Sequence, residues 1–241
     1  MSETESSHVV WTKEYKLDRY REMNKSCKPG QTVFAGSSLM EMFPIEKFVA
    51  EDQLDITVYN RGIGGFVTQE LIDHLDTCIL DLQPSRLFIN IGTNDLSNAS
   101  VTIDELIKQY GLLLDRVKEA LPDCRIYLMA YYPVNDDAAV AAMKPVLLIR
   151  NNEKINAANR AVQALAREKG AQYIDVNDPL KDEQGRLKAA YTIEGMHIKE
   201  AGYRAIYPAI KEYLLSQECS GLGNSLPRHA TISVNNAGNT K

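Results

Sequence analysis

Five short apolar runs are spaced along the chain, and each has the length and composition of a buried strand. They cover residues 32–35, 54–59, 86–91, 125–131 and 172–176. A strand that is apolar along its whole length, rather than at every second residue, is typical of a parallel sheet covered on both faces. The runs therefore predict a buried parallel sheet.

Segments with apolar residues at helical spacing separate these runs. They cover residues 12–26, 68–80, 103–120, 152–169 and 200–216, and the stretch between the first run and Ala50 has the same character. Strands that alternate with helices indicate an α/β fold with right-handed crossover connections. We therefore predict a doubly wound sheet of about five parallel strands.

Three parts of the chain are predicted from these patterns. Residues 1–29 form an N-terminal helical segment packed on the domain, and residues 30–217 form one domain. Residues 218–241 lack a helical pattern and are rich in Gly, Ser and Asn, so they form a flexible tail or an artificial extension. Residues 133–148 contain two prolines and no clear period, which indicates an irregular lid or pocket wall. No linker or internal repeat divides the domain.

Composition and charge exclude several function classes. The net charge of −5 and the absence of a basic cluster argue against a nucleic-acid or anionic-membrane partner. No apolar run has membrane-spanning length, and the N-terminus lacks the apolar core of a secretory signal. The four cysteines are far apart and form no Cys-x-x-Cys pair: Cys27, Cys78, Cys124 and Cys219. We therefore predict reduced thiols, no metal site and a cytoplasmic location.

The first predicted strand ends in Gly36, Ser37 and Ser38, after which a helical pattern begins. This arrangement places a serine at the carboxyl end of a parallel strand, where open α/β sheets bind ligands. The start of a helix also offers free backbone N–H groups to a developing anion. Ser38 is therefore a candidate nucleophile, and the alternative is a helix cap in a Gly-Ser turn.

Later strand ends supply the other groups that acyl transfer needs. The turn after the second strand ends in Gly65, whose missing side chain lets a backbone N–H approach a substrate oxygen. Asn94 follows the third strand and offers a neutral amide donor. Near the C-terminal helix, Glu194 precedes His197 by three residues, so one turn can hold a base and the carboxylate that orients it.

At these four positions the chain resembles the SGNH hydrolases, also called the GDSL esterase/lipase family. The matching blocks are Gly36-Ser37-Ser38-Leu39, Asn60 to Gly65, Gly92 to Asp95, and Glu194 to His197. The resemblance covers about residues 30–215. It is strongest to the branch that is similar to the catalytic subunits of platelet-activating-factor acetylhydrolase.

This resemblance implies a three-layer, flavodoxin-like esterase that needs no metal or cofactor. By position, Ser38 is the nucleophile, His197 is the base, and the oxyanion donors are the backbone of Ser38, the backbone of Gly65 and the side chain of Asn94. Two residues depart from the family pattern. Ser37 replaces an aspartate in the first block, and Glu194 replaces the triad aspartate, so the loop must adjust to the longer side chain.

Residues next to these blocks are candidates for substrate binding: Met40, Phe66, Tyr131, Met196 and Arg150. The absence of a large apolar insertion favours a small-molecule ester with a short acyl group. Two other functions stay open, namely a binding module for a phosphate or nucleotide and a catalytically weak SGNH pseudoenzyme. The apolar faces of the first and last helices leave two interpretations open, namely a homodimer contact or packing of these helices on the core.

Overall fold

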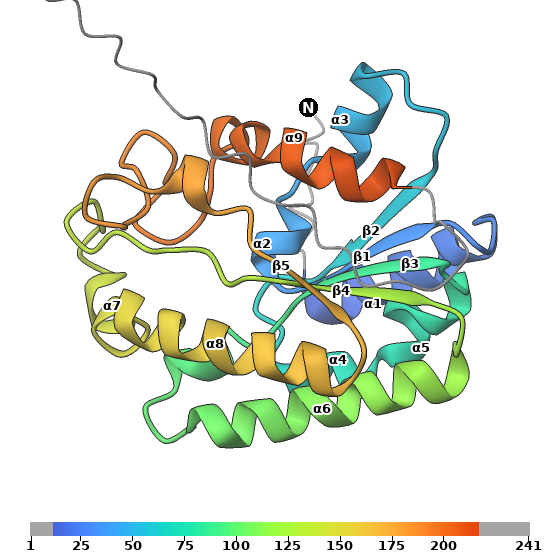
Figure 1. The fold of residues 1–241 in the computed structure, drawn as a ribbon, viewed down its shortest axis with the longest axis horizontal. Helices are drawn as coiled ribbons and strands as arrows, with labels where there is room; N and C mark the ends of the chain where they lie inside the picture. Colours follow the sequence, from blue (N-terminus) through green and yellow to red (C-terminus); the bar gives the residue numbers. More distant parts are fainter. Residues whose placement is uncertain (1–11, 217–241) are drawn as a thin grey trace, which may run out of the picture.

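The computed structural model describes residues 12–216. Its centre is one five-stranded parallel sheet in the order β2-β1-β3-β4-β5 (Figure 1). The strands are β1 (Thr32–Gly36), β2 (Val58–Gly62), β3 (Arg86–Asn90), β4 (Arg125–Met129) and β5 (Gln172–Ile174). The chain starts in the middle, adds one edge strand and then fills the other side, which is the flavodoxin-like doubly wound order. The predicted fold class is therefore confirmed.

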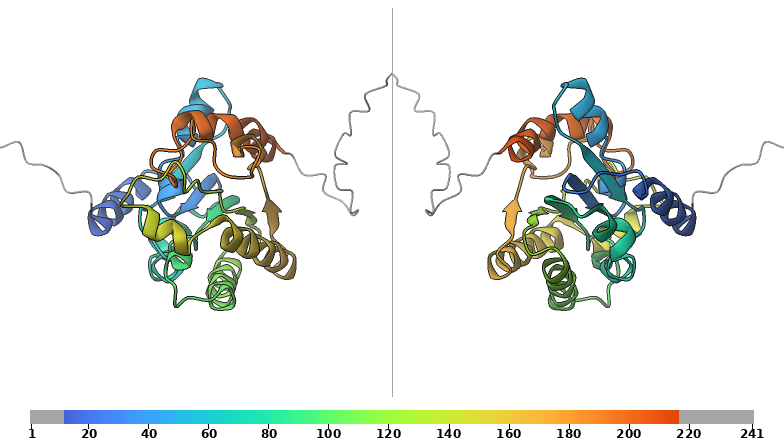
Figure 2. Two further views of the ribbon diagram at one scale, coloured as in Figure 1. Left: turned by 90° about the vertical axis from the view of Figure 1, so that its left-hand side faces the viewer. Right: turned by 90° about the vertical axis from the view of Figure 1, so that its right-hand side faces the viewer.

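Helices cover both faces of this sheet, so the described chain has three layers (Figure 2). One face carries α1 (Lys13–Asn24), α4 (Thr68–Asp73), α5 (Leu75–Cys78), α6 (Ile103–Ala120) and α8 (Asn152–Glu168). The other face carries α2 (Ser38–Glu41), α3 (Ile45–Glu51) and α9 (Glu200–Leu215). A further short helix, α7 (Lys144–Ile149), lies near the turn after β3.

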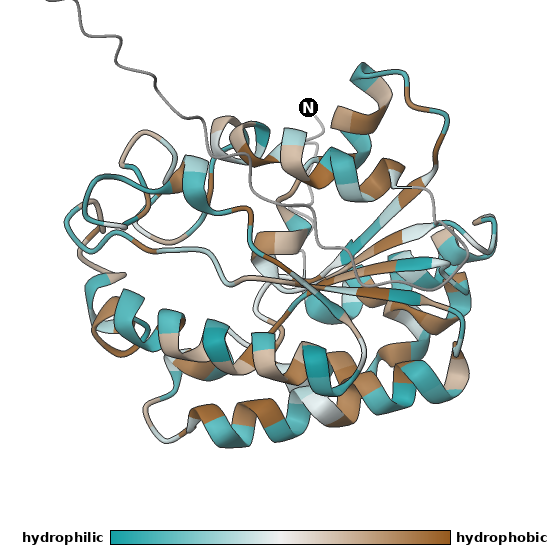
Figure 3. Ribbon diagram, viewed as in Figure 1, coloured by the Kyte–Doolittle hydropathy of each residue, from teal (hydrophilic) through white to brown (hydrophobic). Residues whose placement is uncertain are grey.

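Side chains of each central strand alternate between two hydrophobic cores. In β1, Val33 and Ala35 enter the core beneath α6 and α8, while Phe34 enters the core beneath α9. Phe34 stacks on Phe88, which stacks on Tyr127, with ring centroids 4.6 and 4.5 Å apart. Figure 3 shows hydrophobic positions recurring along the strands and alternating with hydrophilic ones around the helices. This burial on both faces explains why the strands are apolar throughout.

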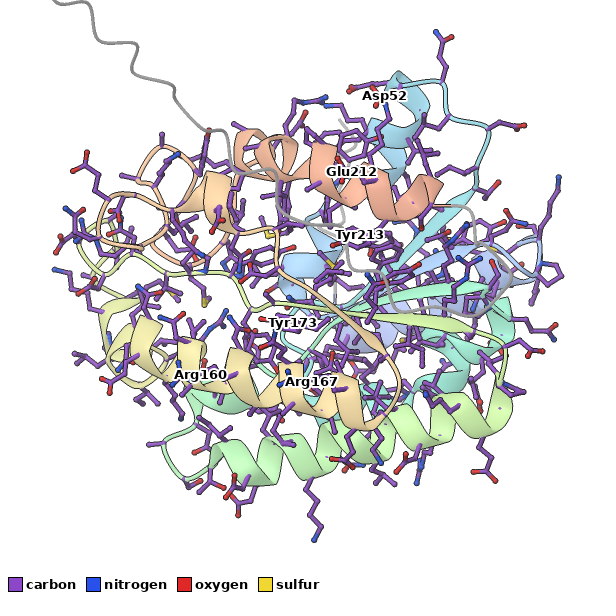
Figure 4. All side chains as sticks on the ribbon, viewed as in Figure 1. Asp52, Arg160, Arg167, Tyr173, Glu212 and Tyr213 are labelled. Carbon is purple, nitrogen blue, oxygen red and sulfur yellow. The ribbon has the colours of Figure 1, made fainter. Side chains whose placement is uncertain are left out.

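The strand β5 forms one edge of the sheet, and Tyr173 lies on it between α8 and α9 (Figure 4). The opposite edge is β2, which differs from its predicted range of 54–59. Its last residues, Asn60, Arg61 and Gly62, are polar or small, yet their backbones pair with β1. Hydrophobic pattern alone misses such a strand end, because its hydrogen bonds are made by the backbone.

Two further predictions needed correction, one of a helix and one of an irregular segment. The helix predicted over residues 68–80 is broken at His74 into α4 and α5. Residues 133–148, predicted to be irregular, contain most of α7, in which Pro145 occupies the first turn where no intrahelical N–H is required. The predicted tail at residues 218–241 lies outside the described residues, and among residues 12–216 no helix is long and apolar enough to cross a membrane.

Candidate active site

The carboxyl ends of three neighbouring strands bring the sequence blocks together. Gly36 at the end of β1 is in register with Gly62 of β2 and Asn90 of β3. The Ile63 N–H donates to the Gly36 carbonyl at 2.9 Å, and the Ser37 N–H donates to the Asn90 carbonyl at 3.3 Å. The turns that follow these strands therefore meet at the carboxyl ends of the strands, where open α/β folds have their ligand sites.

Ser38 is the first residue of α2, directly after the sharp bend that ends β1. A Cβ atom on Gly36 would lie 2.1 Å from the Asn90 carbonyl oxygen, so only glycine lets β1 approach β3 this closely. Because Ser38 opens a helix, its backbone N–H has no acceptor within that helix. The bend thus presents both a hydroxyl and a free N–H at the sheet edge.

His197 connects the serine to a carboxylate. Its Nε2 lies 2.9 Å from Ser38 Oγ, and its Nδ1 lies 2.5 Å from Glu194 Oε1. The same carboxylate oxygen accepts the backbone N–H of His197 at 3.2 Å. A proton on Nδ1 leaves Nε2 as an acceptor for the serine hydroxyl, which is the tautomer that a general base needs. The longer glutamate therefore reaches the histidine in this loop.

The turn over residues 192–198 is closed by its own hydrogen bonds. Thr192 Oγ1 accepts the Gly195 N–H at 2.8 Å and donates to the His197 carbonyl at 3.1 Å. The Asn135 N–H donates to the Gly195 carbonyl at 2.7 Å, which ties the turn to the segment after β4. These hydrogen bonds hold the backbone that carries Glu194 and His197.

The predicted oxyanion donors lie in turns that are also held together. Gly65 adopts φ +79°, a left-handed conformation that favours glycine. Among residues 12–216, no acceptor receives the backbone N–H of Ser38 or Gly65. The Asn94 Nδ2 donates one of its two hydrogens to the Phe66 carbonyl at 2.9 Å, which fixes the orientation of its amide.

Asp95 joins the third block to the helix that follows the second block. Its buried carboxylate accepts the backbone N–H of Thr68 at 3.0 Å and the Thr68 hydroxyl at 3.2 Å. Burial raises the pKa of Asp95, and the hydrogen bonds from Thr68 oppose this effect. The carboxylate therefore braces the start of α4, directly after the turn that contains Gly65.

The residues predicted to bind substrate are almost completely enclosed. Exposed fractions are 0% for Met40, 1% for Phe66, 1% for Tyr131, 2% for Arg150 and 8% for Met196. Tyr131 donates its hydroxyl to the Ile91 carbonyl at 2.7 Å, which supports the turn before Asn94. A substrate-binding role of these five residues stays a prediction.

Arg150 is the one residue with a charged side chain among these five. Its Nε has no hydrogen-bond partner in the described part of the chain, and burial lowers the pKa of its guanidinium to about 10. Tyr131 and the negative charge of Glu194 oppose this lowering of the pKa, and the guanidinium and the Glu194 carboxylate attract one another. Glu194 Oε2 is likewise buried without a partner within residues 12–216. The neighbouring Asn152 side chain binds the Val134 backbone and so has a structural use.

Two residues near the site were not predicted from the sequence. Glu41 lies one helical turn after Ser38, and its Oε2 accepts the Gly64 N–H at 2.6 Å. Its position three residues after the serine was the available signal. Thr192 closes the histidine turn, and no spacing pattern marks it. In residues 12–216, no group of three or more His, Cys, Asp or Glu side chains could hold a metal ion.

Fold and site together define a class of protein. A serine, a histidine and a carboxylate linked in series have the arrangement of a hydrolase triad, which is recognised by geometry rather than by sequence position. The model of the GDSL-like Lipase/Acylhydrolase family matches residues 46–205. The chain belongs to this family and is an ester hydrolase.

Individual relatives agree with this assignment. The chain is 24% identical over 207 residues to platelet-activating factor acetylhydrolase IB subunit alpha1 of Mus musculus, covering 86% of this chain and 84% of that protein. It is 32% identical, with a TM-score of 0.75, to the structure of a Streptococcus pneumoniae protein named as a candidate platelet activating factor, covering 83% and 92% of the two chains. The Axe2 acetylxylan esterase of Geobacillus stearothermophilus shares the fold at 18% identity and a TM-score of 0.60, covering 79% and 96%.

Proposed function

We propose that this protein is a serine esterase that hydrolyses short-chain carboxylic esters through an acyl-enzyme. The observation that carries the proposal is the continuous series from Ser38 Oγ to His197 Nε2 at 2.9 Å and from His197 Nδ1 to Glu194 Oε1 at 2.5 Å. A serine hydroxyl is a weak nucleophile unless an adjacent base removes its proton.

Acylation begins when Ser38 Oγ attacks the ester carbonyl and its proton passes to His197 Nε2. The negative charge of the imidazole's partner, Glu194, stabilises the imidazolium that forms. The Ser38 and Gly65 N–H groups and the second N–H of the Asn94 amide stabilise the oxyanion. His197 then gives the proton to the leaving alcohol as the carbon–oxygen bond breaks.

Deacylation uses the same groups in reverse. A water molecule loses a proton to His197 and attacks the acyl carbonyl of Ser38. Collapse of this second tetrahedral intermediate releases the carboxylic acid, and the proton on His197 returns to Ser38 Oγ. These steps balance without a metal or cofactor.

A short acyl group is favoured by two observations. Met40 and Phe66, which adjoin the nucleophile and the glycine turn, have no more than 1% exposed surface, so neither side chain offers an open apolar surface to a long acyl chain. The acetylhydrolase and the acetylxylan esterase among the similar proteins both carry acetyl in their names. A small-molecule ester with an acetyl or similarly short acyl group is therefore the proposed substrate.

Hydrolysis of p-nitrophenyl acetate, butyrate and octanoate by wild type and Ser38→Ala tests the proposal. We expect wild type to prefer acetate and Ser38→Ala to lose activity by a factor on the order of 10⁴ or more. Labelling of wild type by a fluorophosphonate probe, absent in Ser38→Ala, would show that the serine is activated. If no ester is hydrolysed in a Ser38-dependent manner and the probe does not react, the protein is a binding module or a pseudoenzyme.

A further inference from the structure

The turn that carries the Gly65 N–H is held from outside by the N-terminal helix. We call residues 62–67 the oxyanion turn. It connects β2 to α4, and it contains the backbone groups that the proposed function assigns to the oxyanion. Because an oxyanion donor stabilises charge only when it is already in position, whatever fixes this turn affects turnover.

One lysine–glutamate pair supports the middle of the turn. Glu41 Oε2 accepts the Gly64 N–H at 2.6 Å, while its Oε1 lies 2.6 Å from Lys16 Nζ on α1. The two side chains are 28% and 17% exposed, so solvent screens this pair only in part. Since Ser38 and Glu41 belong to the same short helix, this carboxylate links the nucleophile's helix directly to the oxyanion turn.

A second pair supports the end of the turn in the same way. Lys13 Nζ contacts both oxygens of Glu70, at 2.7 and 2.8 Å, and Glu70 Oε2 accepts the Val67 N–H at 2.9 Å. The lysine stem also covers the glycine, because a Cβ atom on Gly65 would lie 3.3 Å from Lys13 Cε. Each lysine thus holds a carboxylate that in turn holds a backbone N–H.

The same face of α1 continues these contacts along β2. Tyr20 donates its hydroxyl to the Gly62 carbonyl at 2.8 Å, and Asn24 Oδ1 accepts from Arg61 Nε at 2.9 Å. Spacings of three and four residues from Lys13 through Tyr20 to Asn24 place these side chains on one side of a helix. Leu17 is the one fully buried residue of α1, so the helix docks mainly through polar contacts.

We propose that Lys16 and Glu41 are positioning residues for the esterase reaction, with Lys13 and Glu70 as a second pair. They keep the Gly65 N–H directed at the tetrahedral oxyanion. Because both lysines lie on α1, this helix helps to position the oxyanion donor. This inference rests on the proposed function. It also extends beyond the family match, since Lys13, Lys16 and Glu41 precede residue 46.

Lys16→Met and Glu41→Ala test the inference with kcat, KM and inhibition by a trifluoromethyl ketone. The hemiketal oxygen that this inhibitor forms with the serine occupies the oxyanion position, so its Ki reports the donors directly. We expect kcat for p-nitrophenyl acetate to fall about tenfold and Ki to rise by a similar factor, with KM nearly unchanged. Lys16→Arg and Glu41→Gln, which retain a donor or an acceptor, should recover much of the loss.

Matched controls separate positioning from general stability. Glu46→Ala removes a carboxylate that accepts the Asn60 N–H at 2.9 Å, a comparable bond farther back on β2. Lys169→Met removes a pair with Asp115 of 2.7 Å on the far helices. The inference is overturned if Lys16→Met and Glu41→Ala keep wild-type kcat and Ki, or if both controls lose as much activity. Full activity of Ser38→Ala would instead overturn the proposed function itself.

Discussion

Glu194 Oε1 lies 2.5 Å from His197 Nδ1, although the residues are only three positions apart and the acid is a glutamate. The same oxygen accepts the His197 backbone N–H, so the side chain folds back along its own turn. The extra methylene is therefore accommodated by local curvature. This geometry makes the carboxylate the orienting group of the proposed triad.

Replacing Glu194 should reduce turnover strongly. Glu194→Gln removes the charge that stabilises the imidazolium and permits the wrong histidine tautomer, so we expect kcat to fall by roughly 10³–10⁴. Glu194→Asp restores the charge on a shorter arm and should recover part of this loss. The measurement is kcat on p-nitrophenyl acetate, with Glu212→Gln on the exposed side of α9 as the control (Figure 4). Wild-type turnover of Glu194→Gln would reduce the site to a Ser38–His197 dyad.

Much of the fold could be predicted because its hydrophobic pattern is strong. The predicted helix over residues 103–120 coincides with α6, whose Thr102 and Glu105 form a reciprocal cap that begins the helix sharply. The end of β2 could not be predicted this way. Arg61 is fully buried there because Asn24, Cys27 and the Asn60 carbonyl accept its hydrogen bonds, and these partners are distant in sequence or lie on the backbone.

The candidate site was predictable where chemistry follows a strand end. Ser38, Gly65 and Asn94 each come after a strand, so a parallel sheet must bring them to one edge. The supports of these residues were not predictable. Lys16 and Glu41 meet across a long sequence separation, and although Glu41 follows Ser38 by one helical turn, no pattern in the sequence pairs it with Lys16. The burial of Arg150 could not be predicted from the sequence either, because its surroundings come from tertiary packing.

Asp95 should make stability depend on pH in a defined direction. Burial raises its pKa above the ordinary value of 3.8, so the folded state binds this proton more tightly than the unfolded state. The contribution of Asp95 to the free energy of unfolding therefore decreases as pH rises from about 3.8 to the folded pKa, and it is constant above that pH.

Asp95→Asn isolates this effect, since asparagine does not titrate. The difference in unfolding free energy, wild type minus Asp95→Asn, should fall with rising pH through this window. Urea unfolding from about pH 3.5 to about pH 8 measures it. A difference that instead grows with pH would mean that the Thr68 hydrogen bonds outweigh burial and lower the pKa.

Arg150 offers a test of whether a buried charge serves the triad or the substrate. Arg150→Met removes one of two buried groups of opposite charge and leaves the Glu194 carboxylate without it, so we expect the free energy of unfolding to fall, by up to about 3–5 kcal/mol. Because Arg150 attracts the Glu194 carboxylate, we expect kcat to fall about tenfold with KM unchanged. A rise in KM at constant kcat would instead support the predicted substrate contact. Thermal unfolding of the variant is the accompanying measurement.

Tyr203 anchors α9 to the helix of the nucleophile. Its buried hydroxyl donates to the Leu39 carbonyl at 2.7 Å, directly after Ser38 in the chain. Tyr203→Phe leaves that carbonyl unpaired in a dry core, so we expect a loss of about 1–3 kcal/mol of unfolding free energy. Tyr132→Phe is the matched control, because the Tyr132 ring packs against Tyr203 while its buried hydroxyl has no partner within residues 12–216. Removing that hydroxyl should be neutral or stabilising, and urea unfolding of both variants compares the two. Equal losses in the two variants would show that the loss does not come from the hydrogen bond to Leu39.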